Sequence, residues 1–414
     1  MAEAGDNLGR REFLRRGAAG AAALALPAII PASALGKDGA TAPSERLVCG
    51  AIGLGGRGND DIGGFLGRRD VQVVAVCDVY AEHCERARLR VNGTYHNADC
   101  KGYNDFREIT RRDDIDIVMI ATPDHWHAVI ACDAMRYGKD VFCEKPETLT
   151  IREGQILIET ARHLQRVFSG GSQRVWEDYN LLHKVVRSGD FGAPQEVWVN
   201  VGGPSTEPDL PAQPVPEGLD WDRYLGPAPW RPFNNALLNF RNYRDYSGGG
   251  MTDWGAHGFG GALFACGLQD TGPVEIIPPN GKDVPRLTYV FANGVRFYHG
   301  GGWGGVITMK LEHGEFTESG PKKRDGSVKV RDLAIPNYKG RGGLIGDFLY
   351  CVRSRERCWR DIAVAHRTVS VCHLGNLAYW LNRPLKWDPD KQEFIGDAEA
   401  NRWLDRPKRA PWQL

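Results

Sequence analysis

The sequence predicts an α/β protein in which a parallel, doubly wound sheet is followed by an α+β domain with an open, largely antiparallel sheet. Between Leu47 and Gly170, short apolar runs alternate with helical stretches, which indicates parallel strands joined by helical crossovers. After Gly170 the pattern changes to helices and closely spaced short strands. The 414 residues suit two or three domains, at roughly 100–200 residues per domain.

The first domain is predicted to span residues 44–169. Its expected strands are Leu47–Leu54, Val71–Cys77, Ile115–Ala121, Asp140–Cys143 and Arg166–Phe168. Its expected helices are Asn59–Arg69, Ala81–Val91, His125–Tyr137 and Arg152–His163. The strands are near-continuous runs of Val and Ile, which is typical of strands covered on both faces.

The second domain is predicted to span residues 170–414. Its expected helices are Trp176–Ser188, Met251–Cys266, Leu344–Arg355 and Ile362–Leu381. Its expected strands are Gln195–Val201, Val274–Pro278, Leu287–Ala292, Val295–Tyr298 and Val306–Leu311, with Asn293-Gly294 as a hairpin turn. A Pro- and aromatic-rich insertion at residues 203–246 is too long for a simple connector, and such loops are usually functional.

Residues 1–36 have the pattern of a targeting segment and are set apart from the fold. Gly9–Arg15 resembles a twin-arginine signal, Ala18–Ile30 is apolar, and Ala32-Ser33-Ala34 has the pattern of a cleavage site. We therefore expect a mature chain that begins near Leu35 and works in the periplasm or outside the cell. The twin-arginine route carries folded proteins, which suits an enzyme that acquires a cofactor before export.

The composition excludes several classes of protein. Lys+Arg and Asp+Glu are both 52, so the formal charge is zero and the cationic surface of a nucleic-acid binder is not expected. Hydrophobic residues at 42% and charged residues at 25% exclude global disorder. After residue 36, no apolar run approaches the roughly 20 residues of a membrane helix, so we expect no membrane insertion of the mature chain.

The ten cysteines are expected to act mostly as small core residues rather than as a disulfide framework. Cys49, Cys77 and Cys143 lie in apolar runs predicted to be buried strands, and Cys266, Cys351 and Cys372 lie in predicted helices. No C-x-x-C occurs, so a structural zinc site is not expected and we predict no metal. Cys84 and Cys100 are the one pair worth testing for a bridge.

A glycine-rich loop follows the first predicted strand. Gly53-Leu54-Gly55-Gly56-Arg57-Gly58 matches G-x-G-x-x-G, in which the glycines allow a tight turn, close approach of a pyrophosphate and close packing of helix on strand. Asp78 follows the second strand, about 20 residues beyond the last glycine, where an acid binds the ribose 2′-hydroxyl. The sequence therefore predicts a bound dinucleotide. Asp78 favours NAD over NADP. Arg57 is the opposing feature, because it would hold a 2′-phosphate.

Two further loops end parallel strands and are expected to line the same crevice. The first, Thr122–His127, places Thr122 and Pro123 beside the cofactor; His125 and His127 are candidate contacts, or else cap and pack the following helix. The second, Glu144-Lys145-Pro146, brings a lysine that can serve as a proton donor or acceptor.

Asp253 and His257 are a second pair with catalytic potential. They stand at i and i+4 at the start of a predicted helix, so their side chains share a face. Oxidation of an alcohol needs a base for the hydroxyl proton, and Lys145, Asp253 and His257 together suit a proton relay. In this relay Asp253, one turn before His257, is expected to orient the imidazole. The alternatives are an N-cap for Asp253 and a hydrogen-bonded core histidine for His257.

With these motifs the chain resembles the Gfo/Idh/MocA oxidoreductases. The resemblance covers the glycine loop, Asp78, the E-K-P at Glu144–Pro146 and the D-x-G-x-H at Asp253–His257. It implies a Rossmann domain and a C-terminal α/β domain whose open sheet often mediates oligomers, here a dimer or tetramer. It also implies that Lys145 and His257 act on the substrate hydroxyl, with Asp253 nearby and Lys145 touching the cofactor ribose.

Two features of the second domain bear on the branch of this family. Trp387–Pro389 and the Pro-rich insertion resemble a twin-arginine-exported branch. Gly258 and Gly260 depart from the family pattern, in which bulkier or polar residues are common.

The expected function is that of an NAD-dependent dehydrogenase acting on a secondary hydroxyl of a sugar, polyol or glycoside. The alternative is an NAD-retaining enzyme that cleaves a glycoside by transient oxidation of a sugar hydroxyl. The E-K-P favours the dehydrogenase, because exported glycosidases of this family lack it. A non-enzymatic sugar-binding or scaffolding protein is disfavoured by the intact motifs.

Side chains of the insertion and its surroundings offer candidate substrate contacts. Arg241 and Arg244 would suit an acidic sugar, although solvated loop charges are an equally simple interpretation. Aromatic side chains would stack on sugar rings or else anchor the loops: Trp221, Trp230, Phe233, Tyr243, Tyr246 and Trp254.

Overall fold

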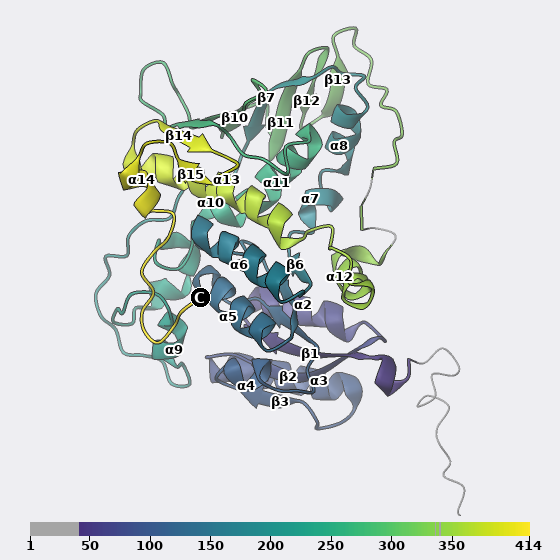
Figure 1. Ribbon diagram of the computed structural model, residues 1–414, viewed down its shortest axis with the longest axis vertical. Coiled ribbons are helices and arrows are strands. Elements are labelled where there is room, and N and C mark those ends of the chain that lie inside the picture. Colours follow the sequence, from purple (N-terminus) through teal and green to yellow (C-terminus); the bar gives the residue numbers. More distant parts are fainter. Residues whose placement is uncertain (1–40, 336, 339–340) are drawn as a thin grey trace, which may run out of the picture. The chain divides into compact units, whose positions relative to one another are not determined.

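The computed structural model describes residues 41–335, 337–338 and 341–414 (Figure 1). The predicted signal at residues 1–36 lies outside these residues. Residues Leu47–Leu414 form one compact unit, and the fold described here is the fold of this unit. In the described part of the chain, no helix is long and apolar enough to span a membrane.

The N-terminal part contains a six-stranded parallel sheet in the order β3-β2-β1-β4-β5-β6. Its strands are β1 (Leu47–Ile52), β2 (Val71–Cys77), β3 (Lys101–Tyr103), β4 (Ile117–Ile120), β5 (Asp140–Cys143) and β6 (Phe168–Gly170). The predicted doubly wound sheet is thus confirmed, with β3 as an additional edge strand. The strand order reverses between β1 and β4, and ligands of such sheets bind at that point, beyond the carboxyl ends of the strands.

Helices cover both faces of this sheet. They are α2 (Gly56–Leu66), α3 (Ala81–Tyr95), α4 (Arg107–Thr110), α5 (Asp124–Arg136) and α6 (Ile151–His163). Helix α2 begins at Gly56, inside the glycine motif and three residues before the predicted start. Its N-terminus therefore opens directly onto the cofactor loop, where free N–H groups favour a phosphate.

The C-terminal part contains a nine-stranded sheet in the order β13-β12-β11-β7-β10-β9-β8-β14-β15. Its strands are β7 (Pro194–Val199), β8 (Glu275–Ile277), β9 (Thr288–Val290), β10 (Arg296–His299), β11 (Ile307–Leu311), β12 (Gly314–Thr317), β13 (Gly320–Lys323), β14 (Leu385–Asp388) and β15 (Glu393–Phe394). Neighbours are antiparallel except β7 and β10, and the hairpin at Asn293-Gly294 joins β9 to β10 as predicted. The largely antiparallel sheet is confirmed.

Helices lie between the two sheets and on the flank of the second (Figure 1). They are α7 (Arg174–Glu177), α8 (Asn180–Arg187), α10 (Gly250–Asp253), α11 (Gly255–Cys266), α12 (Gly343–Ser354), α13 (Ile362–Leu381) and α14 (Ala398–Arg402). The prediction of a single helix at Trp176–Ser188 is wrong, because Asp178 and Tyr179 interrupt it and separate α7 from α8. Helix α13 contacts both α11 and α6, so it links the two halves.

Gly258 and Gly260 are explained by packing. A Cβ at Gly258 would lie 2.8 Å from Cγ1 of Val199 on β7, and a Cβ at Gly260 would lie 2.8 Å from Cγ2 of Val175 on α7. Real Cβ atoms do not come this close to other heavy atoms, so helix α11 can sit this near to its neighbours only with glycine at both positions. Their departure from the family pattern therefore has a structural cause.

The insertion at residues 203–246 forms α9 (Trp221–Leu225), η3 (Asn235–Leu238) and η4 (Phe240–Asn242) around an apolar cluster of its own. Trp221, Phe233 and Tyr246 are buried in that cluster, so they are packing anchors rather than sugar-stacking surfaces. Trp230 and Trp254 are 66% and 43% exposed.

All ten cysteines are free in the structure, so the candidate Cys84–Cys100 bridge is not formed. Cys84 instead lies within sulfur hydrogen-bond range of the Tyr103 carbonyl, at 3.5 Å.

Candidate active site

A cleft of about 420 Å³ opens beyond the carboxyl ends of the parallel strands. Most of the predicted cofactor residues line it: Gly53, Gly55, Gly56, Arg57, Asp78, Thr122, Pro123, His127, Glu144 and Lys145. The insertion supplies a wall that includes Leu219, Tyr224, Phe240 and Arg241, and Trp412 comes from the C-terminal end. Loops that are far apart in the sequence therefore enclose one binding space.

The glycine loop has the shape that a dinucleotide requires. Gly53 has φ +83°, and a Cβ there would lie 2.5 Å from the backbone nitrogen of Thr122. A Cβ at Gly58 would lie 1.9 Å from the Gly53 carbonyl oxygen, so this glycine permits close packing and does not line the cleft. Around Gly55 and Gly56 a Cβ would meet nothing within 4 Å. Bare backbone thus faces open space at the start of α2, which fits a pyrophosphate.

Asp78 lies at the end of β2 in the same cleft. Its Oδ2 accepts a hydrogen bond from the Leu54 N–H at 2.6 Å, and its Oδ1 accepts one from the Tyr80 N–H at 2.8 Å. Each carboxylate oxygen accepts more than one hydrogen bond, so capacity for ribose hydroxyls remains.

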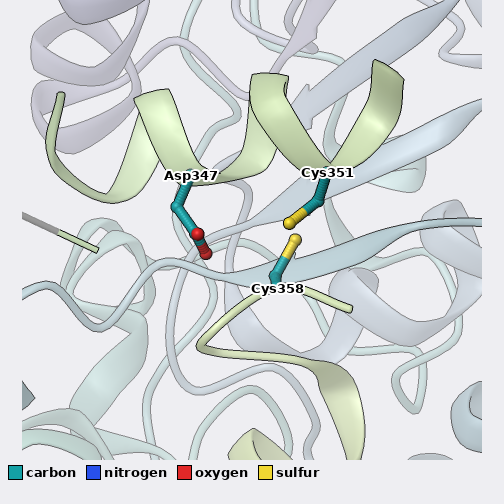
Figure 2. A group of neighbouring side chains, drawn as sticks. All are labelled: Asp347, Cys351 and Cys358. Carbon is teal, nitrogen blue, oxygen red and sulfur yellow. The ribbon is translucent and has the colours of Figure 1, made fainter. Parts of the chain in front are cut away.

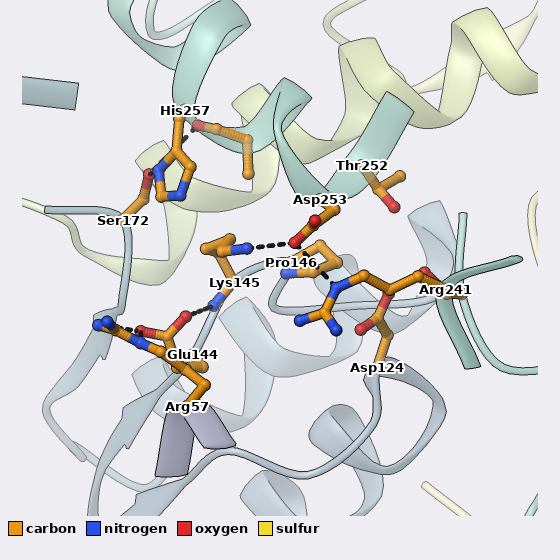
Figure 3. A network of polar contacts seen from close by, with 12 residues as sticks. Arg57, Asp124, Glu144, Lys145, Pro146, Ser172, Arg241, Thr252, Asp253 and His257 are labelled. Atoms are coloured by element: carbon orange, nitrogen blue, oxygen red, sulfur yellow. Dashed lines mark hydrogen bonds and ion pairs between the residues drawn. The ribbon is translucent and has the colours of Figure 1, made fainter. Parts of the chain in front are cut away.

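Arg57, the residue predicted to hold a 2′-phosphate, already forms ion pairs within the protein. One of its nitrogens lies 2.8 Å from Asp61 and 2.9 Å from Glu144 (Figure 3). Burial raises the pKa of both carboxyl groups, and the Arg57 charge opposes that rise. Glu144, in the predicted E-K-P motif, thereby anchors the loop after β5 to α2.

The two histidines after β4 have different surroundings. His127 lines the cleft, and its ring nitrogens lie 2.8 Å from the Thr122 carbonyl and 2.7 Å from the Pro146 carbonyl. It therefore ties the loop after β4 to the loop after β5. His125 is not among the cleft-lining residues; it is buried, with Nε2 3.0 Å from the Tyr224 carbonyl.

Lys145, Asp253 and Arg241 meet at the end of the cleft (Figure 3). The Lys145 ammonium donates a hydrogen bond to Oδ1 of Asp253, and Nε of Arg241 lies 3.1 Å from the same oxygen. Burial alone would raise the pKa of Asp253, but the two cations outweigh it and hold this pKa below its ordinary value. Asp253 is therefore an ionised acceptor between two cations.

The N-cap interpretation of Asp253 is wrong. Asp253 is the last residue of α10, and the N-cap of α11 is Trp254, which makes no side-chain capping bond. The expected orientation of the imidazole by Asp253 is also not what the structure gives. The Nδ1 of His257 instead lies 2.8 Å from Oγ of Ser172, in the loop after β6.

His257 is only 5% exposed and lies in the first turn of α11. Burial, aided by the charge of Lys145, lowers the pKa of His257 to about 3. The imidazole is therefore neutral at neutral pH and has a lone pair available for a proton. Figure 3 shows its ring on the same side of the site as Lys145.

Sequence reasoning gave no catalytic role to three residues at this site. Arg241 comes from the insertion, and Ser172 from the loop after β6, so only tertiary packing brings them here. Asp124, the first residue of α5, accepts a hydrogen bond from Oγ of Ser247 at 2.6 Å, and burial raises its pKa to about 7. Its position in the Thr122–His127 motif, where β4 leads into α5, was the available signal.

The fold and the cleft define an NAD-binding oxidoreductase. A family model described as an oxidoreductase family with an NAD-binding Rossmann fold matches residues 47–172. A second, described as the C-terminal alpha/beta domain of that oxidoreductase family, matches residues 178–296 and 328–414. The chain belongs to the Gfo/Idh/MocA oxidoreductase family.

Curated relatives include proteins with glycosidase names. An alpha-N-acetylgalactosaminidase of Shewanella oneidensis is 35% identical over 211 residues, which cover 45% of this chain and 44% of the relative. A glycosyl hydrolase family 109 protein of Shewanella sp. (strain MR-4) is 38% identical over 207 residues, with the same coverage. The alignments thus span less than half the length of these relatives.

Solved structures share the fold. The WlbA dehydrogenase of Bordetella pertussis, in complex with NADH and UDP-GlcNAcA, has a TM-score of 0.59 at 14% identity over 83% of this chain and 99% of that one. The aldose-aldose oxidoreductase of Caulobacter crescentus has a TM-score of 0.58 at 17% identity, over 82% and 99%.

Proposed function

We propose that this protein is an NAD-dependent oxidoreductase that removes a hydride from a carbon bearing a secondary hydroxyl of a sugar, polyol or glycoside. The observation that carries the proposal is the placement of Lys145, which lines the cofactor cleft and is ion-paired with Asp253 from the other half of the molecule. When bound, NAD supplies the hydride acceptor. The bare backbone at Gly55-Gly56 and the Asp78 carboxylate are the groups that would hold it.

The site residues divide the proton chemistry. The Lys145 ammonium, oriented by Asp253, donates a hydrogen bond to the substrate oxygen and stabilises the negative charge that develops there. Neutral His257 accepts the hydroxyl proton, because burial and the adjacent cation keep the imidazole unprotonated. Ser172 holds the ring through a hydrogen bond at Nδ1, so Nε2 is the nitrogen that accepts the proton. In the reverse direction the same groups return the proton.

Two further observations bear on the choice of cofactor and substrate. Because Arg57 is paired with Glu144 and Asp61, it has less capacity to hold a 2′-phosphate, which favours NAD over NADP. Arg241 is paired with Asp253, and Arg244 is paired with Glu207. These pairings lessen the support for an acidic sugar and favour a neutral one.

A second candidate function rests on the identity of 35–38% to the glycosidase-named relatives. In it, the same oxidation acidifies a neighbouring C–H bond, the aglycone leaves by elimination, water adds, and the hydride returns to the sugar. The net reaction is then hydrolysis without net NADH. The cleft would serve both functions, since both begin with oxidation of a hydroxyl.

The test is to incubate the cofactor-loaded protein with excess NAD and a panel of free sugars, polyols and nitrophenyl glycosides. NADH absorbance and nitrophenol release are followed together. NADH accumulation without aglycone identifies the dehydrogenase, and aglycone release without NADH accumulation identifies the glycosidase. Lys145→Met should lower the rate of either signal at least about a hundredfold. The matched control Lys310→Met, half-exposed on β11, should keep the rate. An unchanged rate in Lys145→Met would contradict the proposal.

A further inference from the structure

A second cluster of reactive side chains lies outside the cofactor cleft (Figure 2). Asp347 and Cys351 stand one turn apart on α12, and Cys358 lies in the connection between α12 and α13. One oxygen of Asp347 and the two sulfurs all lie within 4.8 Å of one another, and the two sulfurs point toward each other. All three residues are buried, and none lines the cleft.

The guanidinium group of Arg341 already contacts this cluster. Nη1 of Arg341 lies 3.0 Å from Oδ1 of Asp347 and 3.6 Å from Sγ of Cys351. The other oxygen of Asp347 accepts a hydrogen bond from the Trp359 N–H at 2.7 Å. The cation therefore neutralises Asp347 and contacts one of the sulfurs, which favours thiol chemistry over metal binding.

The thiol of Cys351 is activated by its neighbours. A hydrogen bond from the Cys358 thiol lowers the pKa of Cys351 against the opposing effects of burial and of the Asp347 charge, and the Arg341 charge acts in the same direction as the hydrogen bond. Thiolate is the nucleophile in disulfide exchange, so the cluster has an activated sulfur with a second thiol in contact with it.

We propose that Cys351 and Cys358 are a redox-active dithiol that closes into a disulfide by exchange with a small-molecule disulfide. The reagent's S–S bond breaks, and one S–S bond forms between the two cysteines. The two thiol protons leave with the two molecules of released thiol. The cysteines are oxidised by two electrons, and the reagent is reduced by two. Reagent access requires local opening at the exposed residues Glu356 and Arg357, next to Cys358.

The disulfide would restrain a segment that is hydrogen-bonded to β6, close to Ser172. Arg360, two residues after Cys358, is buried, and its carbonyl oxygen accepts a hydrogen bond from the Gly170 N–H at 2.9 Å. Gly170 ends β6, two residues before Ser172, which holds His257. Oxidation is therefore expected to tighten residues 355–361. This inference does not depend on the proposed reaction.

The test uses the full chain, first reduced and then incubated with oxidised glutathione. We expect the intact mass to fall by two hydrogens and a digest to give one cross-linked peptide that joins Cys351 to Cys358. Amides of residues 355–361 should then exchange on the order of tenfold more slowly. Cys351→Ser and Cys358→Ala should each abolish the cross-link and the slowing, whereas the control Cys84→Ser should keep both.

Three results would overturn the proposal. One is a wild-type chain whose two cysteines both stay open to alkylation after oxidation and unfolding. Another is a stable mixed disulfide with glutathione and no internal bridge. The third is stoichiometric zinc on the protein as purified that is lost in Cys351→Ser, because the cluster would then be a metal site.

Discussion

The ammonium of Lys145 and the carboxylate of Asp253, 108 positions apart in sequence, form a hydrogen-bonded ion pair at the end of the cofactor cleft. Lys145 follows β5 of the parallel sheet, and Asp253 ends α10 of the C-terminal part. The reacting end of the cleft is therefore assembled from both halves, and its charge balance depends on their packing.

Replacement of Lys145 by Met should lower kcat by about 10²- to 10⁴-fold, the usual contribution of a positioned acid–base group. NAD affinity should change little, because the glycine loop and Asp78 make separate contacts. Steady-state kinetics and NAD titration on the same preparation check both parts. An unchanged kcat would remove Lys145 from the mechanism.

Asp253→Asn should lower kcat while leaving the melting temperature close to that of the wild type. The asparagine keeps the size of the side chain but loses the charge that pairs with Lys145 and Arg241. A helix cap would behave differently, since its loss costs about 1 kcal/mol of stability. A lower melting temperature at unchanged kcat would refute the catalytic role of this pair.

Asp78→Asn should weaken NAD binding about tenfold and narrow the preference for NAD over NADP, because hydrogen bonds to charged groups are worth about 1.5–3 kcal/mol. Nucleotide titrations of both cofactors provide the measurement. Asp99→Asn, an exposed change on the same domain, is the matched control. Equal loss for both nucleotides would mean that Asp78 only shapes its loop through Leu54 and Tyr80.

The buried histidines should each contribute a loss of stability as the pH falls below 6.5. Burial lowers the pKa of His183 from 6.5 to about 3, and the same direction holds for five other buried histidines: His125, His127, His257, His366 and His373. Between about 3 and 6.5 the unfolded chain binds more protons than the folded chain, so unfolding free energy rises with pH in that window.

A single substitution isolates this effect. His183 packs between Trp176 and Phe264, with ring centroids 5.4 and 4.7 Å away. His183→Leu should flatten the dependence of melting temperature on pH between 4 and 6.5, and the half-exposed His313→Leu should not. Buried carboxyl groups whose pKa is raised, among them Asp61, Asp124 and Glu147, contribute the opposite pH dependence, and that contribution is common to both variants. Identical slopes in wild type and His183→Leu would contradict the assignment.

Helices and strands that consist mainly of apolar residues could be predicted from the sequence. Strand β2 at Val71–Cys77 and helix α13 at Ile362–Leu381 have the predicted bounds, because largely apolar segments end at clear turn signals. Strands β3 and β13 were missed, since each is short and largely polar and is held by its neighbours rather than by a buried face. Such strands exist through pairing, which local pattern does not show.

The site was predictable only where a motif ends a strand or begins a helix. Lys145 and Asp253 met this condition, and the structure brings them together. Arg241 and Ser172 did not, because one sits in an irregular insertion and the other is a small polar residue after an edge strand. Their roles depend on the distance to Asp253 and His257, which only the folded chain sets.

The central claim is that a hydride leaves the substrate carbon that bears the hydroxyl, with Lys145 and Asp253 at that carbon. The most direct measurement uses a substrate found in the panel, deuterated at that carbon, with one enzyme equivalent of bound NAD. The nicotinamide, isolated after the time that one wild-type turnover takes and analysed by mass spectrometry, should carry deuterium in the wild type and at most about 1% of that amount in Lys145→Met. Formation of the oxidised product with no deuterium in the nicotinamide would contradict the account.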